Sequence, residues 1–374
     1  MITRNRIPLV DLQEQYFRLR KDIDAGISRV IENGSFILGK EVEAFEAAFA
    51  AYCESPFCVG VSSGTDSLEQ ALGAMGVGNE DEVITVAHTF IATVEAVYAV
   101  GARPRFVDVD PGTLLMDVAQ IESVITPRTK AIIPVHLYGQ MVDMDAVVAV
   151  ASKHGLKVLE DCAQAHGARY NGKIAGSVGD IGSFSFYPGK NLGAYGDAGG
   201  LVCRDENLAL HMKKGRNHGR MGKYEHDFIG RNARMDGIQG AILATKLPHL
   251  DSWNQRRREI ANRYDAALAS VSGVHLLTVH PDAVPVYHLY VIRVQNRDVV
   301  LTHLKECGIE VGVHYPVPLH LQPACADLGY RPGQFPVTEA AAKEILSLPI
   351  WPEMEDSVVD TVVAAFMDAV SAAS

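Results

Sequence analysis

The chain has 374 residues, of which 48% are hydrophobic, so it is long enough to bury a sizeable core and to form a large domain and a smaller one. Its 34 basic and 45 acidic residues give a net charge of −11, which argues against general binding to nucleic acids or anionic membranes. The six cysteines lack CxxC spacing, so no metal site is indicated. No hydrophobic signal core and no apolar run near the ~20 residues of a membrane helix are found. We therefore expect a cytoplasmic protein whose partners are small molecules or other subunits.

Strand-like and helix-like segments alternate from residue 56 to about residue 203. This alternation is typical of a mostly parallel sheet with helices on both faces. Helices are predicted at 67–75 and 144–154, and strands at 83–86, 105–109, 131–135, 157–160 and 181–186. Ligands of such sheets bind at the carboxyl ends of the strands, so the site is expected at that edge.

A second unit is predicted toward the C-terminus. The helical run at 236–246 is followed by a polar helix at about 250–269. Beyond it the pattern predicts a strand around 287–294, a helix near 298–307 and a strand near 310–315. We therefore expect a large α/β domain over residues 1–249, including an N-terminal helical arm, and a small C-terminal α/β domain over residues 250–374.

One lysine follows the last strand of the first series. The apolar run ending at Tyr187 is stopped by Pro188-Gly189, and Lys190 comes next in a glycine-rich turn. A lysine amine desolvated in such a place loses its proton more easily and becomes a nucleophile toward a carbonyl. A solvated turn lysine is the alternative.

A helix start and a strand end carry further polar residues. Ser63, Gly64 and Thr65 precede a helical run, where free backbone amides form an anion site, although simple capping explains the same pattern. Asp161 and Gln164 follow the strand at 157–160. If Lys190 carries a pyridine aldehyde as an imine, Asp161 can pair with the ring nitrogen and keep it protonated; otherwise Asp161 caps a loop.

A histidine follows another strand. His88, in the segment AHTFIATVEAV, comes just past the strand at 83–86. There its flat ring can stack on a bound ring, although lone histidines are more often ordinary core or surface residues.

Together these motifs resemble the DegT/DnrJ/EryC1/StrS family of nucleotide-sugar aminotransferases, which have the fold-type-I architecture of pyridoxal-phosphate enzymes. The resemblance covers nearly the whole chain and rests on IPLVDLQEQY, NGSFILGKEVEAFE, SGTDSLEQAL, HTFIAT, EDCAQAHGA, FSFYPGKNLGAYGDAGG, RNHG, GRNARMDGIQGAIL and HYPVPLHLQ. It implies a mostly parallel seven-stranded sheet flanked by helices, a smaller C-terminal domain and pyridoxal 5′-phosphate as cofactor, with the pyridoxamine form as an intermediate.

The resemblance also implies roles for individual residues. Lys190 is matched to the lysine that forms the imine and shuttles the proton, and Asp161 to the partner of the pyridinium nitrogen. The other cofactor-binding matches are Gln164 beside the ring hydroxyl, His88 on the ring face, Gly64, Thr65 and Ser185 at the phosphate, and Asn232 reaching the phosphate of a neighbouring subunit. The last match implies a homodimer with shared active sites. Substrate-binding positions are matched by Tyr187, Tyr315 and His320.

The form FYPGKNLGAYGD, with His88, is most similar to members that aminate C3 of a dTDP-3-keto-6-deoxyhexose to give a dTDP-3-amino-3,6-dideoxyhexose. The amino donor implied is an amino acid, with L-glutamate the usual one. The alternatives are C4 amination of a GDP-, UDP- or dTDP-4-keto sugar, 3-amination of a UDP-keto-uronic acid, and a non-catalytic regulatory or binding protein.

The stretch at 211–226 concentrates basic residues in an acidic chain. It contains Lys213, Lys214, Arg216, Arg220 and Lys223. Such a cluster suits a diphosphate-bearing substrate, and a solvated loop is the alternative.

Overall fold

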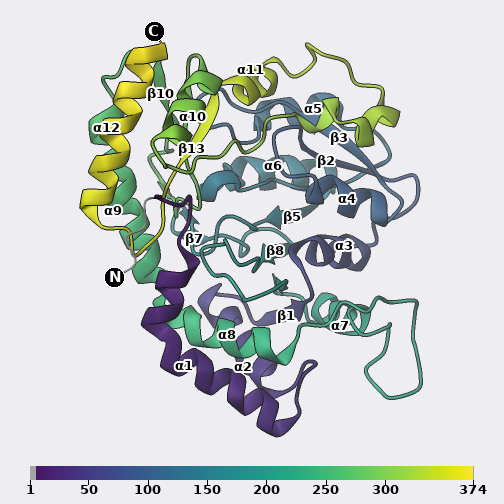
Figure 1. Cartoon of the computed structure of the whole chain (residues 1–374). Coiled ribbons are helices and arrows are strands. Elements are labelled where there is room, and N and C mark those ends of the chain that lie inside the picture. The colour runs from purple at the N-terminus through teal and green to yellow at the C-terminus, as the bar shows by residue number, and fades with distance from the viewer. Residues whose placement is uncertain (1–5, 374) are drawn as a thin grey trace.

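A seven-stranded sheet forms the centre of the molecule (Figure 1). The computed structural model describes residues 6–373. The strand order is β1 (Phe57–Val61), β9 (Gly199–Cys203), β8 (Ile181–Ser185), β5 (Lys157–Asp161), β4 (Thr129–Ile132), β2 (Glu82–Val86) and β3 (Arg103–Val107). The last five of these run parallel, and β9 is antiparallel to both of its neighbours. The predicted mostly parallel seven-stranded sheet is confirmed.

Helices cover this sheet. On it lie α3 (Gly64–Ala74), α4 (Ala92–Ala99) and α7 (Glu206–Gly215), with α3 in contact with the other two. Next to β1 packs α2 (Lys40–Tyr52), and α8 (Gly237–Lys246) packs against α2 and against α1 (Leu12–Asn33). Short α5 (Ile121–Val124) lies against β3, and α6 (Met144–His154) lies against β5.

Local signals explain the bounds of α6, which match the prediction. The side chain of Asp143 accepts a hydrogen bond from the Ala146 amide at 3.0 Å and so caps the first turn. Gly155 ends the helix with φ 65°, in the left-handed region that glycine adopts most easily.

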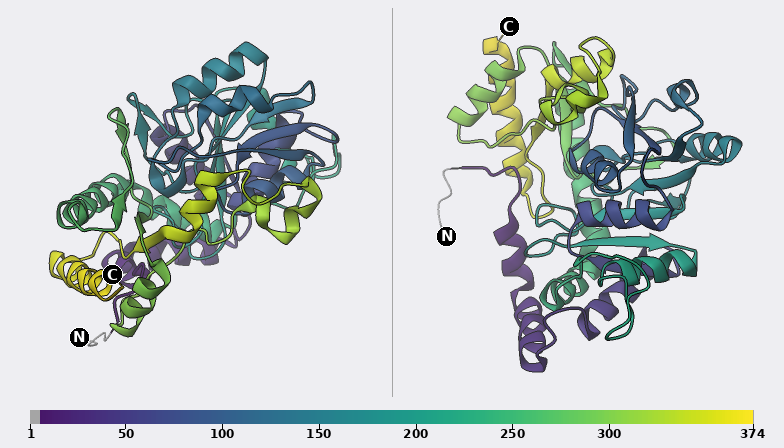
Figure 2. Two further views of the ribbon diagram at one scale, coloured as in Figure 1. Left: turned by 90° about the horizontal axis from the view of Figure 1, so that it is seen from above. Right: turned by 90° about the vertical axis from the view of Figure 1, so that its right-hand side faces the viewer.

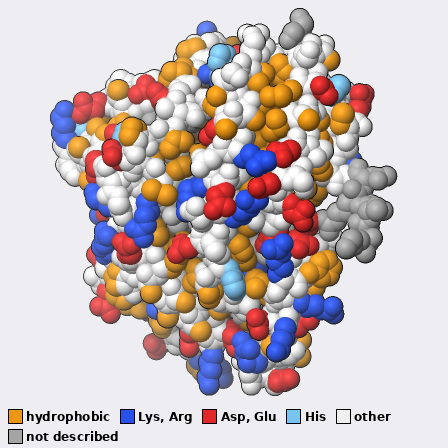
Figure 3. All heavy atoms as spheres, turned by 90° about the vertical axis from the view of Figure 1, so that its left-hand side faces the viewer, with side chains coloured by type: hydrophobic (Ala, Val, Ile, Leu, Met, Phe, Trp, Pro, Cys, Tyr) orange, Lys and Arg blue, Asp and Glu red, His pale blue; other side chains and the backbone are white. Residues whose placement is uncertain are grey.

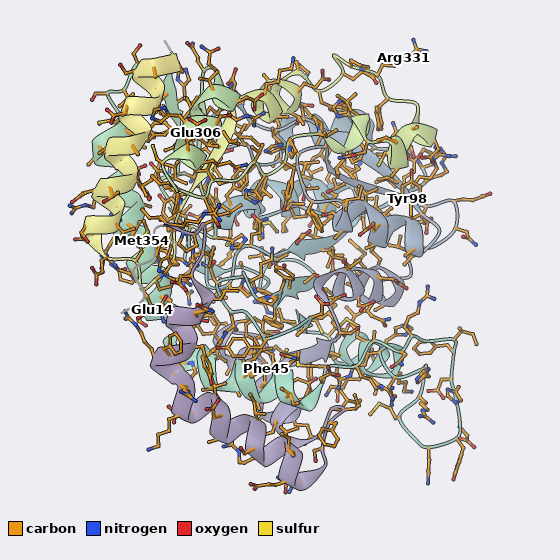
Figure 4. All side chains as sticks on the ribbon, in the orientation of Figure 1. Glu14, Phe45, Tyr98, Glu306, Arg331 and Met354 are labelled. Carbon is orange, nitrogen blue, oxygen red and sulfur yellow. The ribbon has the colours of Figure 1, made fainter. Side chains whose placement is uncertain are left out.

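An aromatic cluster fixes the end of β8. Phe45, labelled in Figure 4, is fully buried on α2. Its ring centroid lies 5.5 Å from that of Phe49 and 5.2 Å from that of Phe186. Because Phe186 directly follows β8, this packing holds the strand end from which the chain continues to Lys190.

A second core lies beside the large sheet (Figure 2). It is enclosed by α9 (Leu250–Leu268), α10 (Arg297–Glu306), α12 (Asp356–Ala373) and a sheet of β10 (Val274–Leu276), β12 (Tyr290–Val294) and β13 (Ile345–Leu348). Leu250 belongs to the core of the large sheet, whereas Ile260, on the same helix, belongs to the second core. The division of the chain at 249/250 stays a prediction.

The prediction of a strand at 310–315 was wrong. Its pairing with β13 is limited to a bridge between Gly312 and Ser347, and the chain then leaves the sheet. The segment thus lies beside β13, a strand that the sequence did not predict and that follows α11 (Pro336–Glu344) directly. A third, small sheet joins β11 (Ala283–Val284), β6 (Arg169–Tyr170) and β7 (Lys173–Ile174).

Acidic and basic side chains alternate on the face formed by α1, α9 and α12 (Figure 3). Ion pairs join two of these helices: Arg256 to Asp356 and Arg263 to Asp360, each at 2.6 Å. Among the helices of residues 6–373, none has both the length and the apolar character needed to cross a membrane.

Candidate active site

A cavity of about 580 Å³ lies at the carboxyl ends of β2, β4, β5 and β8. This is the edge of the sheet at which the sequence predicted the site. The cavity brings together eight of the eleven predicted residues: Gly64, Thr65, Asp161, Gln164, Ser185, Tyr187, Lys190 and Tyr315. The segments that carry them are far apart in the chain, so the fold assembles them.

The N-terminus of α3 forms one wall. Ser63 is its N-cap and accepts a hydrogen bond from the Asp66 amide at 3.0 Å, and it also lines the cavity. A Cβ atom on Gly64 would lie 2.5 Å from the Cβ of Ser185, and a Cβ on Gly199 would lie 2.1 Å from the Ser63 carbonyl oxygen. The helix start, β8 and β9 are therefore in contact at distances that only glycine permits. Backbone amides and short hydroxyls meet there, which suits an anion.

Asp161, the last residue of β5, is a buried carboxylate that lines the same cavity. Thr93 in the first turn of α4 donates a hydrogen bond to its Oδ2 at 2.9 Å, and the Ala163 amide donates to Oδ1 at 3.2 Å. Burial raises the pKa of Asp161, while these two donors and the nearby charge of Lys190 oppose the increase. A cation placed against this carboxylate stabilises its ionised form.

Lys190 lines the same cavity, with its side chain partly buried. Burial lowers the pKa of its amine to about 8, and the carboxylate of Asp161 opposes that decrease. The amine is therefore far easier to deprotonate than an ordinary lysine. The amide of Lys190 donates to the Tyr187 carbonyl at 2.8 Å, which fixes the turn.

Gln164 and His88 belong to one buried hydrogen-bond chain. The side-chain oxygen of Gln164 accepts from the Tyr138 amide at 2.7 Å, and its amide group donates to the Tyr315 hydroxyl at 3.4 Å. The Tyr138 hydroxyl lies 2.7 Å from Nε2 of His88 and donates to the His314 carbonyl at 2.5 Å. His88 is buried and does not line the cavity, and burial lowers its pKa to about 4. Its ring is therefore neutral near pH 7.

Aromatic side chains also line the cavity. Phe90 and Tyr187 expose 51% and 58% of their surface, and the Phe90 ring centroid lies 5.5 Å from that of Tyr315. Such rings offer flat apolar faces to a sugar or a base.

Besides His88, two predicted residues lie outside the cavity lining. Asn232 is exposed and its backbone pairs with Asn217. His320 is buried, with Nε2 3.0 Å from the Glu339 carboxylate and its ring 4.7 Å from that of Phe335. This geometry gives His320 structural contacts within the chain; its role toward a substrate stays a prediction.

The basic stretch is partly used within the chain. Arg216 is buried, where it forms an ion pair with Glu46 and donates to the Gly60 carbonyl. Lys214 forms an ion pair with Asp227. These two cations are therefore committed to internal contacts.

Sequence reasoning missed several residues of the site. They are Thr93, Asp197, His288 and His314 in the lining, and Tyr138 behind it. Thr93 ends the quoted motif HTFIAT, and a threonine five residues after His88 places a hydroxyl in the following helix turn. For Tyr138, which reads as an apolar core residue, the sequence offers no such signal.

Comparisons with known proteins support this interpretation of the site. A model of the DegT/DnrJ/EryC1/StrS aminotransferase family matches residues 18–367. The chain is 50% identical over 358 residues to the "Erythromycin biosynthesis sensory transduction protein EryC1" of Saccharopolyspora erythraea, covering 96% of this chain and 98% of that protein. It is 47% identical over 350 residues to the "dTDP-3-amino-3,4,6-trideoxy-alpha-D-glucose transaminase" of Streptomyces venezuelae, covering 94% and 92%. The crystal structure of S. venezuelae DesV in complex with a ketimine intermediate superposes with a TM-score of 0.95 at 46% identity, covering 97% and 98%.

Aminotransferases of this family depend on pyridoxal 5′-phosphate, and the residues present fit that group. The cavity has an anion cradle at α3, an easily deprotonated lysine and a buried carboxylate. These are the features required by a phosphate, an aldehyde and a ring nitrogen. The family match over nearly the whole chain confirms the resemblance, the fold type and the enzyme class expected from the sequence. The chain belongs to the DegT/DnrJ/EryC1/StrS aminotransferase family.

Proposed function

We propose that this enzyme transfers an amino group from an amino acid, L-glutamate, to C3 of a dTDP-3-keto-6-deoxyhexose and so forms a dTDP-3-amino-3,6-dideoxyhexose. The observation that carries the proposal is the convergence of Lys190, Asp161 and the α3 cradle on one cavity. The position of amination is supported by the transaminase of S. venezuelae at 47% identity, whose name specifies a 3-amino sugar linked to dTDP.

The cofactor's phosphate is assigned to the α3 cradle. There the Gly64 and Thr65 amides have no partner within the helix, and the hydroxyls of Thr65 and Ser185 line the same cavity. The positive end of the helix dipole adds to the attraction for an anion. With the phosphate held at this cradle, Asp161 would pair with the ring nitrogen and Lys190 would react with the aldehyde, since both line the same cavity.

When bound, pyridoxal phosphate supplies an electron sink for the carbon that carries the transferred nitrogen. Asp161 keeps the ring nitrogen protonated, held in place by Thr93 and the Ala163 amide. The free Nζ of Lys190 removes the proton from the α-carbon of the amino donor and delivers a proton to C3 of the sugar. An amine with a pKa of about 8 suits both directions of transfer near neutral pH.

A second copy of the chain is proposed to complete each site. Asn232 lies outside its own chain's cavity, at the end of a loop that exposes apolar side chains. In this loop Tyr224 exposes 79% of its surface and Ile229 exposes 97%. Apolar side chains so exposed favour burial against a partner, and a homodimer brings Asn232 to the phosphate of the neighbouring subunit.

The test is a coupled spectral and product assay. Protein reconstituted with pyridoxal phosphate should be yellow, and with L-glutamate and a dTDP-3-keto-6-deoxyhexose it should yield the 3-amino sugar by mass spectrometry. Lys190→Ala should abolish both signals. A protein that stays colourless after reconstitution would instead support a binding or regulatory role, as the name "sensory transduction protein" of the S. erythraea relative suggests.

A further inference from the structure

The structure contains a buried lysine for which the proposed reaction has no use. Lys246, the last residue of α8, has no exposed surface. Its Nζ donates to the Gly193 carbonyl oxygen at 2.7 Å and lies 4.1 Å from the centroid of the Tyr195 ring. Both contacts are with the loop that follows Lys190.

Burying this amine is costly. A lysine loses its hydration on burial, and here the hydrogen-bond partner of the amine is a neutral carbonyl. Burial lowers the pKa of Lys246 to about 7, with Glu353 opposing the decrease. A methionine or leucine at the end of α8 would fill the space without that cost. The presence of a hydrogen-bonding amine at this buried position therefore requires an explanation.

The loop that Lys246 holds is closed tightly around Lys190. The Ala194 amide donates to the Phe186 carbonyl at 2.8 Å, which closes the turn containing Lys190. A Cβ on Gly193 would lie 2.3 Å from the Pro188 carbonyl oxygen, so the two arms of the turn lie against each other. A displacement of Gly193 is thus transmitted to Pro188 and to Lys190, two residues further on.

Two other side chains fix the same loop from outside. The Tyr195 amide donates to Oε1 of Gln239, also on α8, at 2.9 Å. Nδ2 of Asn191 donates to Oδ1 of Asn254 and to the Val286 carbonyl, each at 2.9 Å. Lys246 supplies the bond at the point between these two anchors, where the loop turns back.

We propose that Lys246 is a positioning residue that holds the Gly193 carbonyl and thereby fixes the position and desolvation of the Lys190 amine. The inference rests on the proposed role of Lys190. Without the bond, the turn loosens and water reaches the amine, so the Lys190 pKa rises toward the ordinary lysine value of about 10.4.

The test uses Lys246→Met, which keeps an unbranched side chain only one atom shorter and removes the donor. In cofactor-free protein, the rate at which Lys190 condenses with added pyridoxal phosphate is followed against pH. In this reaction the amine nitrogen bonds to the aldehyde carbon and water leaves. The inflection near pH 8 expected for wild type should move upward in the variant. In the complete assay kcat should fall by about 10- to 100-fold, with KM for the sugar nucleotide within about twofold.

Two further variants complete the design. Thr245→Val removes a side-chain bond to the Ala241 carbonyl at the neighbouring position of α8 and should leave the inflection and kcat unchanged. Lys246→Arg keeps a donor and should hold the inflection near that of wild type. If Lys246→Met does not fold, Lys246→Leu takes its place as the donor-free variant, with the same upward shift expected. A wild-type inflection in the folded donor-free variant would overturn the proposal. A shift in Lys246→Arg as large as that in the donor-free variant would overturn it as well. The condensation needs no sugar, so a wrong sugar assignment would leave this result intact.

Discussion

Asp161 shows how individual residues set the chemistry of the site. Burial alone would favour its neutral form, and the hydrogen bonds from Thr93 and the Ala163 amide favour the ionised form. The ionised form is the one that pairs with a protonated ring nitrogen. The hydroxyl of Thr93 therefore helps to keep Asp161 ionised.

Replacing Thr93 by valine tests this effect of the hydroxyl on Asp161. The variant loses the donor to Oδ2, so the pKa of Asp161 rises further above its ordinary value. Since the ionised carboxylate is the active form, the acidic limb of the pH profile of kcat/KM should move to higher pH. Near neutral pH, activity should fall by about threefold to tenfold.

Thr93→Ser is the matched control for this change. It restores a hydroxyl and should return the acidic limb to its wild-type position. An unmoved limb in Thr93→Val would show that Asp161 does not depend on this bond.

Residues that belong to a recognisable family motif could be predicted from the sequence. Residues whose contacts join distant segments of the chain could not. Lys190, Asp161, Gln164 and Ser185 were named from the sequence and line one cavity. His88 was expected on a ring face, yet its visible contact is with the hydroxyl of Tyr138. That contact joins residues fifty positions apart, and no local pattern encodes it.

Among the elements, α3 has the most direct part in the site. Its first residue, Gly64, lies against Ser185 at the end of β8, and the contact leaves no space for a Cβ. The helix start is thereby brought to the strand end that leads to Lys190. The phosphate cradle depends on this close approach.

Gly64→Ala should displace the start of α3. Overpacking of this kind costs about 1–3 kcal/mol, so the affinity for pyridoxal phosphate should fall by about tenfold or more. Binding titrations with pyridoxal phosphate and with pyridoxal, which lacks the phosphate, measure the effect. The loss should be larger for the phosphorylated compound.

Gly73→Ala, in the same helix, is the control. A Cβ there meets no atom within 4 Å, so alanine should leave the affinity unchanged and stabilise the helix by up to about 1 kcal/mol. Equal losses of affinity in the two variants would mean that the cradle is not at Gly64.

Elements with a clear period or a bounding turn signal could be predicted from the sequence, whereas β13 could not. The helix at 144–154 has both caps and was predicted with its bounds. β13 is four residues long and follows a helix without a turn signal. The alternation at 310–315 predicted a strand, but after the bridge at Gly312 the chain turns toward the cavity, which His314 and Tyr315 line. Tertiary contacts therefore overrode the local pattern.

For the molecule as a whole, the proposed homodimer concerns the phosphate end of the site. Asn232 and the exposed apolar loop before it lie away from their own cavity. The homodimer proposed above places them at the neighbouring subunit. Within such a dimer, each site uses Lys190 from one copy and Asn232 from the other.

Mixing two inactive variants tests this arrangement. Lys190→Ala and Asn232→Ala homodimers should each be severely impaired. After subunit exchange, a hybrid dimer contains one site with both residues intact and one with neither. Random exchange should therefore restore about one quarter of wild-type activity. Activity that stays at the average of the two parents would contradict shared sites.

Amination at C3 by the Lys190 site can be checked in one spectroscopic experiment. The enzyme is loaded with pyridoxamine phosphate, and matched 3-keto and 4-keto dTDP-, UDP- and GDP-sugars are added one at a time while the aldehyde-form absorbance is followed. We expect rapid return of that absorbance with a dTDP-3-keto-6-deoxyhexose. Return only with a 4-keto sugar, or with none of the series, would rule out amination at C3 of such a sugar.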